Sequence, residues 1–71
     1  MGIVKVIEVI ASSENSFEDA VRNAVKEVSE TVRNIDSVYV KDLKVHVRDG
    51  EIESYGAICK VSFRVDTNLK M

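Results

Sequence analysis

The side chains that could do chemistry in this 71-residue sequence are few and far apart. His46 is the one histidine and Cys59 the one cysteine, so the chain can form neither an internal disulfide nor a cysteine-based zinc site. Glu8 is an acid within an apolar run and has no second group for proton transfer. We interpret His46 as a solvated or interfacial side chain, Cys59 as a buried inert thiol, and Glu8 as the ion-pair partner of a basic residue across the sheet or a subunit boundary.

No glycine-rich phosphate loop and no nucleophile-elbow motif occurs anywhere in the sequence. Without these motifs and without a catalytic pair, the sequence predicts a protein that is not an enzyme.

A second group of candidates consists of carboxylates in the latter half of the chain. Oxygen ligands of this kind suit a hard cation such as calcium, although their spacing matches no EF-hand loop. One hypothesis is a metal site in which these acids meet copies of themselves from neighbouring subunits. The alternative is that nearby basic side chains neutralise them. The acids concerned are Asp42, Asp49, Glu51 and Glu53, with Asp36 before them, and the basic residues are Lys41, Lys44, Arg48 and Lys60.

Composition excludes several classes of protein. Hydrophobic residues make up 45% and charged residues 31% of the chain, which is the balance of a globular domain and not of a disordered segment. Ten basic against twelve acidic residues give a net charge of −2, so we expect no nucleic-acid partner. The apolar run near the start is too short for a membrane span and lacks a signal-peptide pattern. We therefore expect a cytoplasmic protein with no membrane partner.

The chain is short for the amount of apolar surface that it must cover. Residues 1–71 are expected to form a single domain, and one core of this size supplies only about 3–5 kcal/mol of stability. Thirteen valines and six isoleucines nevertheless need a dry environment. Because neither disulfides nor a cysteine-based metal site is available, we expect self-association.

The apolar pattern predicts a strand followed by a helix. Residues 3–11 are rich in β-branched side chains and apolar on both faces, as in a strand covered from both sides. A helix is predicted over residues 17–33, because apolar side chains recur there at helical spacing. Ser16 is the expected N-cap, and Asp19 completes an imperfect capping box.

Two further strands are predicted in the second half. Residues 37–48 alternate but change phase near residues 41–42, which indicates a β-bulge. Asp49 and Gly50 predict a type I′ hairpin turn, and the strand over residues 52–66 is long for a domain of this size. The expected fold class is α+β: a β-α-β-β chain whose three-stranded antiparallel sheet wraps around one amphipathic helix. Residues 67–71 are expected to fray.

The complete pattern resembles the dodecin family over residues 3–66. The resemblance rests on collinear segments and not on any one motif: KVIEVIASSENSFEDAV, the helix end TVRNI, the strand start DSVYVKDLKV, a DG hairpin and the closing strand YGAICKVSFRVD. Membership would imply a hollow homododecamer, with twelve copies burying the surplus apolar surface. Many dodecins bind flavins, stacked in pairs between tryptophans of two-fold-related subunits, and store them without catalysis.

The resemblance also implies a ligand site, from which two typical residues are missing. The stacking tryptophan of the family aligns with Ser37, and the glutamine that bonds the ring edge aligns with Gly56. Tyr39 lies on the same strand face as Ser37 and could offer a substitute aromatic surface. Lys44 and Arg64 stand where some relatives carry basic residues near the ligand phosphate.

Three functions follow as hypotheses. The first is a non-enzymatic protein that stores a small ligand, FMN or riboflavin, with weakened affinity. The double change Ser37→Trp and Gly56→Gln is expected to strengthen that binding. The second is a flavin-free shell that binds a metal ion such as calcium or is purely structural. The third, a small enzyme, has no catalytic pairing to support it.

Overall fold

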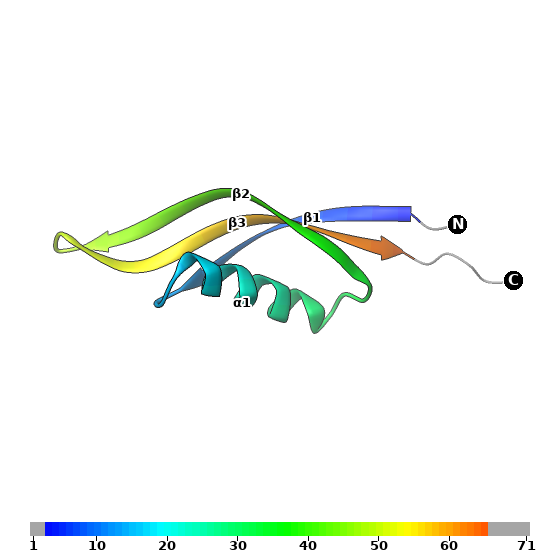
Figure 1. The fold of residues 1–71 in the computed structure, drawn as a ribbon, viewed down its shortest axis with the longest axis horizontal. Helices are drawn as coiled ribbons and strands as arrows, with labels where there is room; N and C mark the ends of the chain where they lie inside the picture. The colour runs from blue at the N-terminus through cyan, green and yellow to red at the C-terminus, as the bar shows by residue number, and fades with distance from the viewer. Residues whose placement is uncertain (1–2, 66–71) are drawn as a thin grey trace, which may run out of the picture.

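The computed structural model describes residues 3–65, which form four elements in the order β-α-β-β (Figure 1). The elements are β1 (Ile3–Ser13), α1 (Phe17–Ser29), β2 (Ile35–Arg48) and β3 (Glu51–Val65). The three strands form one antiparallel sheet in the order β1-β3-β2, with β3 in the middle. The expected α+β class and β-α-β-β order are therefore confirmed.

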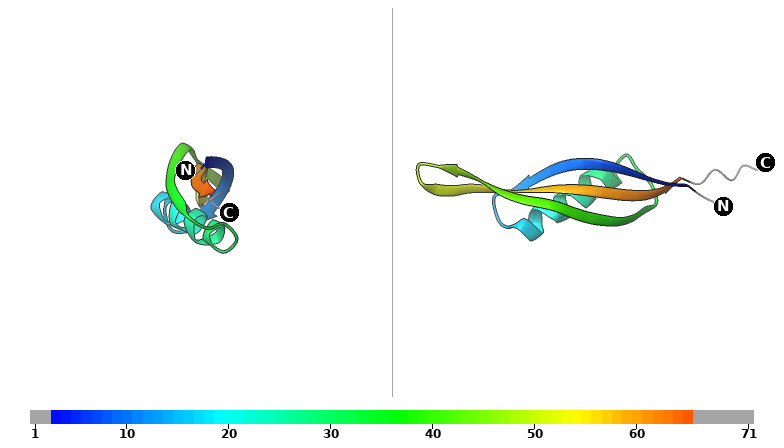
Figure 2. Two further views of the ribbon diagram at one scale, coloured as in Figure 1. Left: turned by 90° about the vertical axis from the view of Figure 1, so that its right-hand side faces the viewer. Right: turned by 90° about the horizontal axis from the view of Figure 1, so that it is seen from above.

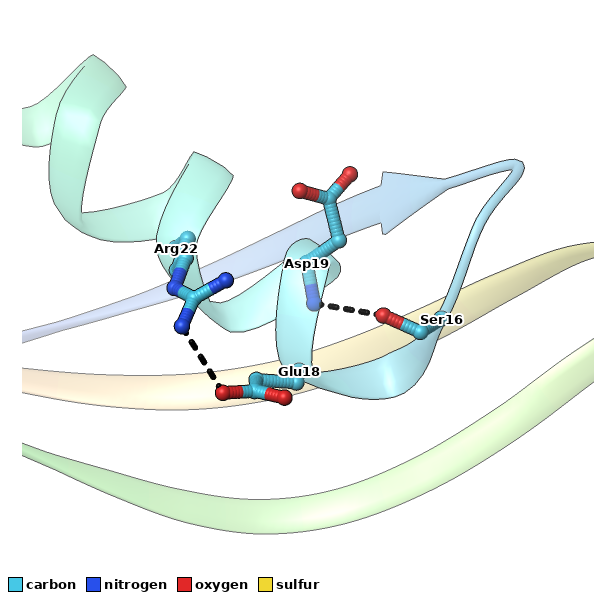
Figure 3. Close-up of polar contacts among 4 residues, drawn as sticks. All are labelled: Ser16, Glu18, Asp19 and Arg22. Carbon is cyan, nitrogen blue, oxygen red and sulfur yellow. Dashed lines mark hydrogen bonds and ion pairs between the residues drawn. The ribbon is translucent and has the colours of Figure 1, made fainter.

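The helix begins where the sequence predicts. The Asp19 backbone N–H donates to Ser16 Oγ at 3.0 Å, so Ser16 is the N-cap (Figure 3). Asp19 does not complete a capping box, because its carboxylate accepts from the Ser13 hydroxyl at 2.6 Å and from the Asn15 amide instead. These two hydrogen bonds lower the pKa of Asp19, with a smaller contribution from the charge of Arg22. The Ser16 N–H is satisfied by Ser13 Oγ, which ties the end of β1 to the helix.

Replacing Ser16 by alanine should destabilise the protein by about 1 kcal/mol per chain, because one helix N–H loses its acceptor. Chemical denaturation followed by circular dichroism measures this difference. Ser29→Ala is the matched control, since the exposed Ser29 hydroxyl only donates to the Val25 carbonyl at 2.6 Å within the helix. Equal stability losses in the two variants would contradict the assignment of the cap.

The helix ends earlier than the predicted residue 33. After Ser29 the chain tightens, with the Glu30 and Thr31 N–H groups donating to carbonyls three residues back. Asn34 then takes a left-handed conformation with φ of 63°, which asparagine tolerates well. Its carbonyl accepts from the Arg64 N–H at 2.9 Å. Helical spacing continues through Val32, but this contact to β3 redirects the backbone.

The hairpin between β2 and β3 is confirmed, and so is the predicted β-bulge in β2. Asp49 and Gly50 both have positive φ, 53° and 78°, as a type I′ turn requires. The register changes between Val40 and Asp42, where the sequence places the bulge. Two further register changes, between residues 35 and 37 and between residues 46 and 47, were not predicted. The strand bounds differ from the expected ones by one or two residues: β1 continues to Ser13, β2 begins at Ile35 and β3 begins at Glu51. Residue 66 of the predicted third strand and the predicted frayed end, residues 67–71, lie outside the described residues.

The core beneath the sheet is small. Only Ala20, Ala24 and Val28 of α1 and Ala57, Cys59 and Val61 of β3 are buried hydrophobic residues among those described. The chain measures 58 × 19 × 13 Å, and its radius of gyration of 15.0 Å exceeds the roughly 11 Å usual for this length. The hairpin end of β2 and β3 projects well beyond α1 as an arm (Figure 2). A single chain therefore leaves much of its apolar surface uncovered.

Candidate functional site

The face of the sheet turned away from α1, called the outer face here, carries the candidate ligand residues. Alternate residues of β3 point to opposite faces, and Ala57, Cys59 and Val61 pack toward the helix. The residues between them therefore point outward, together with their cross-strand partners on β1 and β2. Between Ser62 and Gly56 the pairing gives four rows across the sheet: Val6–Ser62–Ser37, Glu8–Lys60–Tyr39, Ile10–Ile58–Asp42 and Ser12–Gly56–Lys44.

Ser37 and Tyr39 lie in adjacent rows, as the sequence predicts for residues two apart on one strand. Tyr39 is 67% exposed, so its ring offers a flat accessible surface. Ser37 faces Ser62, and this pair of small hydroxyl side chains leaves space beside the ring. The arrangement can hold a flat aromatic molecule against one tyrosine, with polar groups at its side.

Arg64 belongs to the same end of the outer face, two residues beyond Ser62. Its guanidinium lies 3.7 Å from the Asp36 carboxylate, and both side chains are more than half exposed. An exposed pair of this kind is weak and can open to an anionic ligand.

Lys44 and Gly56 form a separate group. They are paired directly across β2 and β3, and Gly56 is six positions along β3 from Ser62. Six residues of strand span about 20 Å, so one chain does not bring this pair next to Ser37. A ligand that touches both groups would have to take them from different copies of the chain.

The acidic candidates are spread along the hairpin. Glu53 lies 3.5 Å from the Arg48 guanidinium, while Asp49 is in the turn and Asp42 is paired with Ile58. Within residues 3–65, no three acidic, histidine or cysteine side chains cluster closely enough to hold a metal ion. A shared calcium site therefore requires several copies of the hairpin.

The structure shows the surroundings of Glu8, Cys59 and His46, the three residues interpreted one by one from the sequence. Glu8 lies 3.8 Å from the ammonium group of Lys41 on β2, which confirms its ion pair across the sheet. Cys59 is fully buried, and this burial raises the pKa of its thiol, as expected for an inert cysteine. His46 is exposed on the arm and faces Ser54.

Sequence reasoning did not associate Lys60 or Ser62 with the ligand residues. Their outward alternation on β3 was readable from the sequence, but their partners depend on the register. That register includes three irregularities, of which one was predicted.

Comparison with known proteins places this arrangement in a family. The dodecin family model matches residues 3–66. The chain belongs to the dodecin family. A dodecin of Thermus thermophilus is 25% identical over 64 residues, covering 90% of this chain and 93% of that protein.

Solved dodecin structures share the fold over nearly the whole chain. The dodecin of Streptomyces coelicolor superposes with a TM-score of 0.90 at 30% identity, covering 94% of this chain and 96% of that one. A protein of Mycobacterium tuberculosis, described as a calcium-chelating immunodominant antigen and calcium dodecin, is 28% identical. It superposes with a TM-score of 0.80 over 97% and 99% of the two chains. Both the family and the fold inferred from the sequence are thus confirmed. As for membranes, α1 is neither long nor apolar enough to cross a bilayer, and it is the one helix in the described part of the chain.

Proposed function

We propose that this dodecin is a non-enzymatic small-ligand storage protein that works as a hollow assembly of twelve copies, with weakened flavin binding. The observation that carries the proposal is the outer-face group of Ser37, Ser62 and the exposed Tyr39. It offers one aromatic surface, Tyr39, in the row next to Ser37, the position with which the stacking tryptophan of the family aligns. The small core supports assembly, and so do the exposed apolar residues of the arm, Leu43, Val47 and Ile52.

The visible absorption spectrum of the purified protein gives a first test of this proposal. Oxidised flavin is yellow, so a protein that binds it weakly should elute colourless, and it should quench the fluorescence of added flavin only at high protein concentration. Bound flavin that survives purification and dialysis would contradict the weakened affinity.

A second candidate function is a flavin-free shell that holds calcium. The similarity to the calcium dodecin of Mycobacterium tuberculosis favours it, as do Asp42, Asp49, Glu51 and Glu53 along the hairpin. Symmetry would bring copies of one acid together, and a cation between them would relieve their repulsion.

If calcium binds between copies, millimolar calcium should raise the melting temperature relative to EDTA by mass action. Thermal melts of the same sample in the two buffers, with calorimetric titration, make the measurement. The variant Glu51→Gln should lose part of the shift, whereas Glu14→Gln, outside the hairpin, should keep it. Equal melting temperatures in the two buffers, with no heat of calcium binding in the titration, would exclude this function. The alternative, that nearby basic side chains neutralise the acids, would then hold.

A further inference from the structure

The arm begins where the sheet changes from three strands to two. Ser13, the last residue of β1, is paired with Tyr55 of β3, and Tyr55 is paired with Val45 of β2. Beyond this row β2 and β3 continue as a two-stranded hairpin, while α1 runs back from the base of the arm beneath the three-stranded part of the sheet (Figure 1). Tyr55 is therefore the β3 residue at the base of the arm.

The arm has little of its own to fix its direction. Two-stranded ribbons twist more strongly than larger sheets, and a two-stranded hairpin alone is marginally stable in water. The register of this hairpin changes between His46 and Val47, close to the base, and an irregularity of that kind bends a strand. A contact at the base is therefore needed if every copy is to hold its arm at the same angle.

One aromatic contact lies at that base. Phe17 is the first residue of α1, and its ring meets the Tyr55 ring edge to face, with the ring centroids 5.1 Å apart and the ring planes at 77°. Aromatic pairs prefer this geometry, because the positive edge of one ring faces the negative face of the other. The contact therefore constrains both distance and angle, whereas aliphatic contacts are non-directional. It ties the base of the arm to the start of the helix, which the Ser16 cap holds in place.

We propose that Phe17 is a positioning residue for the ligand site: its ring holds Tyr55, and so fixes the direction in which the arm meets a neighbouring copy. The inference rests on the proposed function, in which copies assemble and a flat ligand lies on the outer face. Gly56, next to Tyr55, belongs to the group about 20 Å from Ser37 within one chain, so a complete site takes its two halves from two copies. A change in the direction of the arm then changes how the two halves meet, although Phe17 itself belongs to α1, on the other face of the sheet.

The experiment measures FMN affinity in a Ser37→Trp background by quenching of flavin fluorescence, after light scattering has given the mass of each variant. Phe17→Leu keeps an apolar side chain but removes the ring, and should weaken FMN binding about two- to tenfold, the range of one aromatic pair. Phe17→Tyr keeps the ring and should keep the affinity. Tyr55→Leu removes the same contact from the other side, should Phe17→Leu not fold. The double variant should lose no more affinity than either single variant, because both changes break one contact.

Val28→Ala is the matched control for a merely structural effect. Val28 is a buried residue of α1, about three turns along the helix from Phe17. Its truncation should lower the midpoint of chemical denaturation, as Phe17→Leu also should, but leave the FMN affinity unchanged.

The outcomes separate the inference from the proposed function. Equal FMN affinity with phenylalanine and with leucine at position 17 would overturn the inference alone. So would an equal loss of affinity in Val28→Ala, or additive losses in the double variant. Loss of the assembled mass in Phe17→Leu and Tyr55→Leu, but not in Val28→Ala, would support the inference through assembly. Failure of the Ser37→Trp protein to bind flavin would overturn the proposed flavin function, and the inference with it.

Discussion

Ser37→Trp should raise the affinity for FMN by about tenfold or more. Each aromatic pair contributes about 0.5–1.5 kcal/mol beyond area burial, and a two-fold-related copy would supply a second tryptophan to the same stack. The cross-strand partner of Ser37 is Ser62, whose small side chain leaves space for a larger one on the outer face. Quenching of flavin fluorescence in a titration measures the gain.

The matched control places the same residue elsewhere on the outer face. Ser54→Trp, paired with His46 on the arm, should give no comparable gain because it lies far from Tyr39. Unchanged affinity in the Ser37 variant, or tight flavin binding by the unmodified protein, would show that the site is wrongly placed. In the double variant with Gly56→Gln, the stem of Lys44 has to shift slightly, because a Cβ atom at position 56 would stand 3.2 Å from Lys44 Cγ.

Charged side chains on the apolar arm should both dissociate the assembly and unfold the chain. Leu43 and Val45 are 51% and 38% exposed, and Val47 and Ile52 are 61% and 54% exposed, so the arm has little cover within its own chain. Burying such a side chain contributes about 1.5–3 kcal/mol, repeated in every copy. The variant Leu43→Asp with Val45→Asp should elute at the mass of one or two chains and lose its helical circular dichroism.

A control with the same added charge at two polar positions separates apolar burial from electrostatic repulsion. The variant His46→Asp with Ser54→Asp places two carboxylates on the same arm and should keep both mass and helicity. A Leu43→Asp, Val45→Asp variant that assembles like the unmodified protein would mean that the arm is not an interface. A variant that dissociates into well-folded single chains would mean that the small core is sufficient.

The local elements could be read from the sequence because each has its own chemical signal. The Ser16 cap, the Asp49-Gly50 turn and the phase change at residues 41–42 all appear in the structure as predicted. The helix end could not be read in this way, because the spacing continues through Val32. Beyond the helix end, the backbone turns at Asn34, whose carbonyl accepts from the N–H of Arg64, a residue thirty positions away.

The candidate site was only partly readable for a related reason. Residues two apart on one strand share a face, so the grouping of Ser37 with Tyr39 follows from the sequence. The position of Lys44 over Gly56 depends on the register of two strands, and that register includes bulges with no phase signal. Nothing within one chain indicates which copies meet, so the calcium hypothesis also depends on assembly.

The central claim is that this chain is stable only as part of a closed assembly that covers the arm and the outer apolar residues. Size-exclusion chromatography with light scattering on the unmodified protein, at micromolar concentration, tests it most directly. We predict one species of about twelve times the 7.9 kDa chain mass, as dodecin membership implies. A folded species of one or two chains at that concentration would contradict the account.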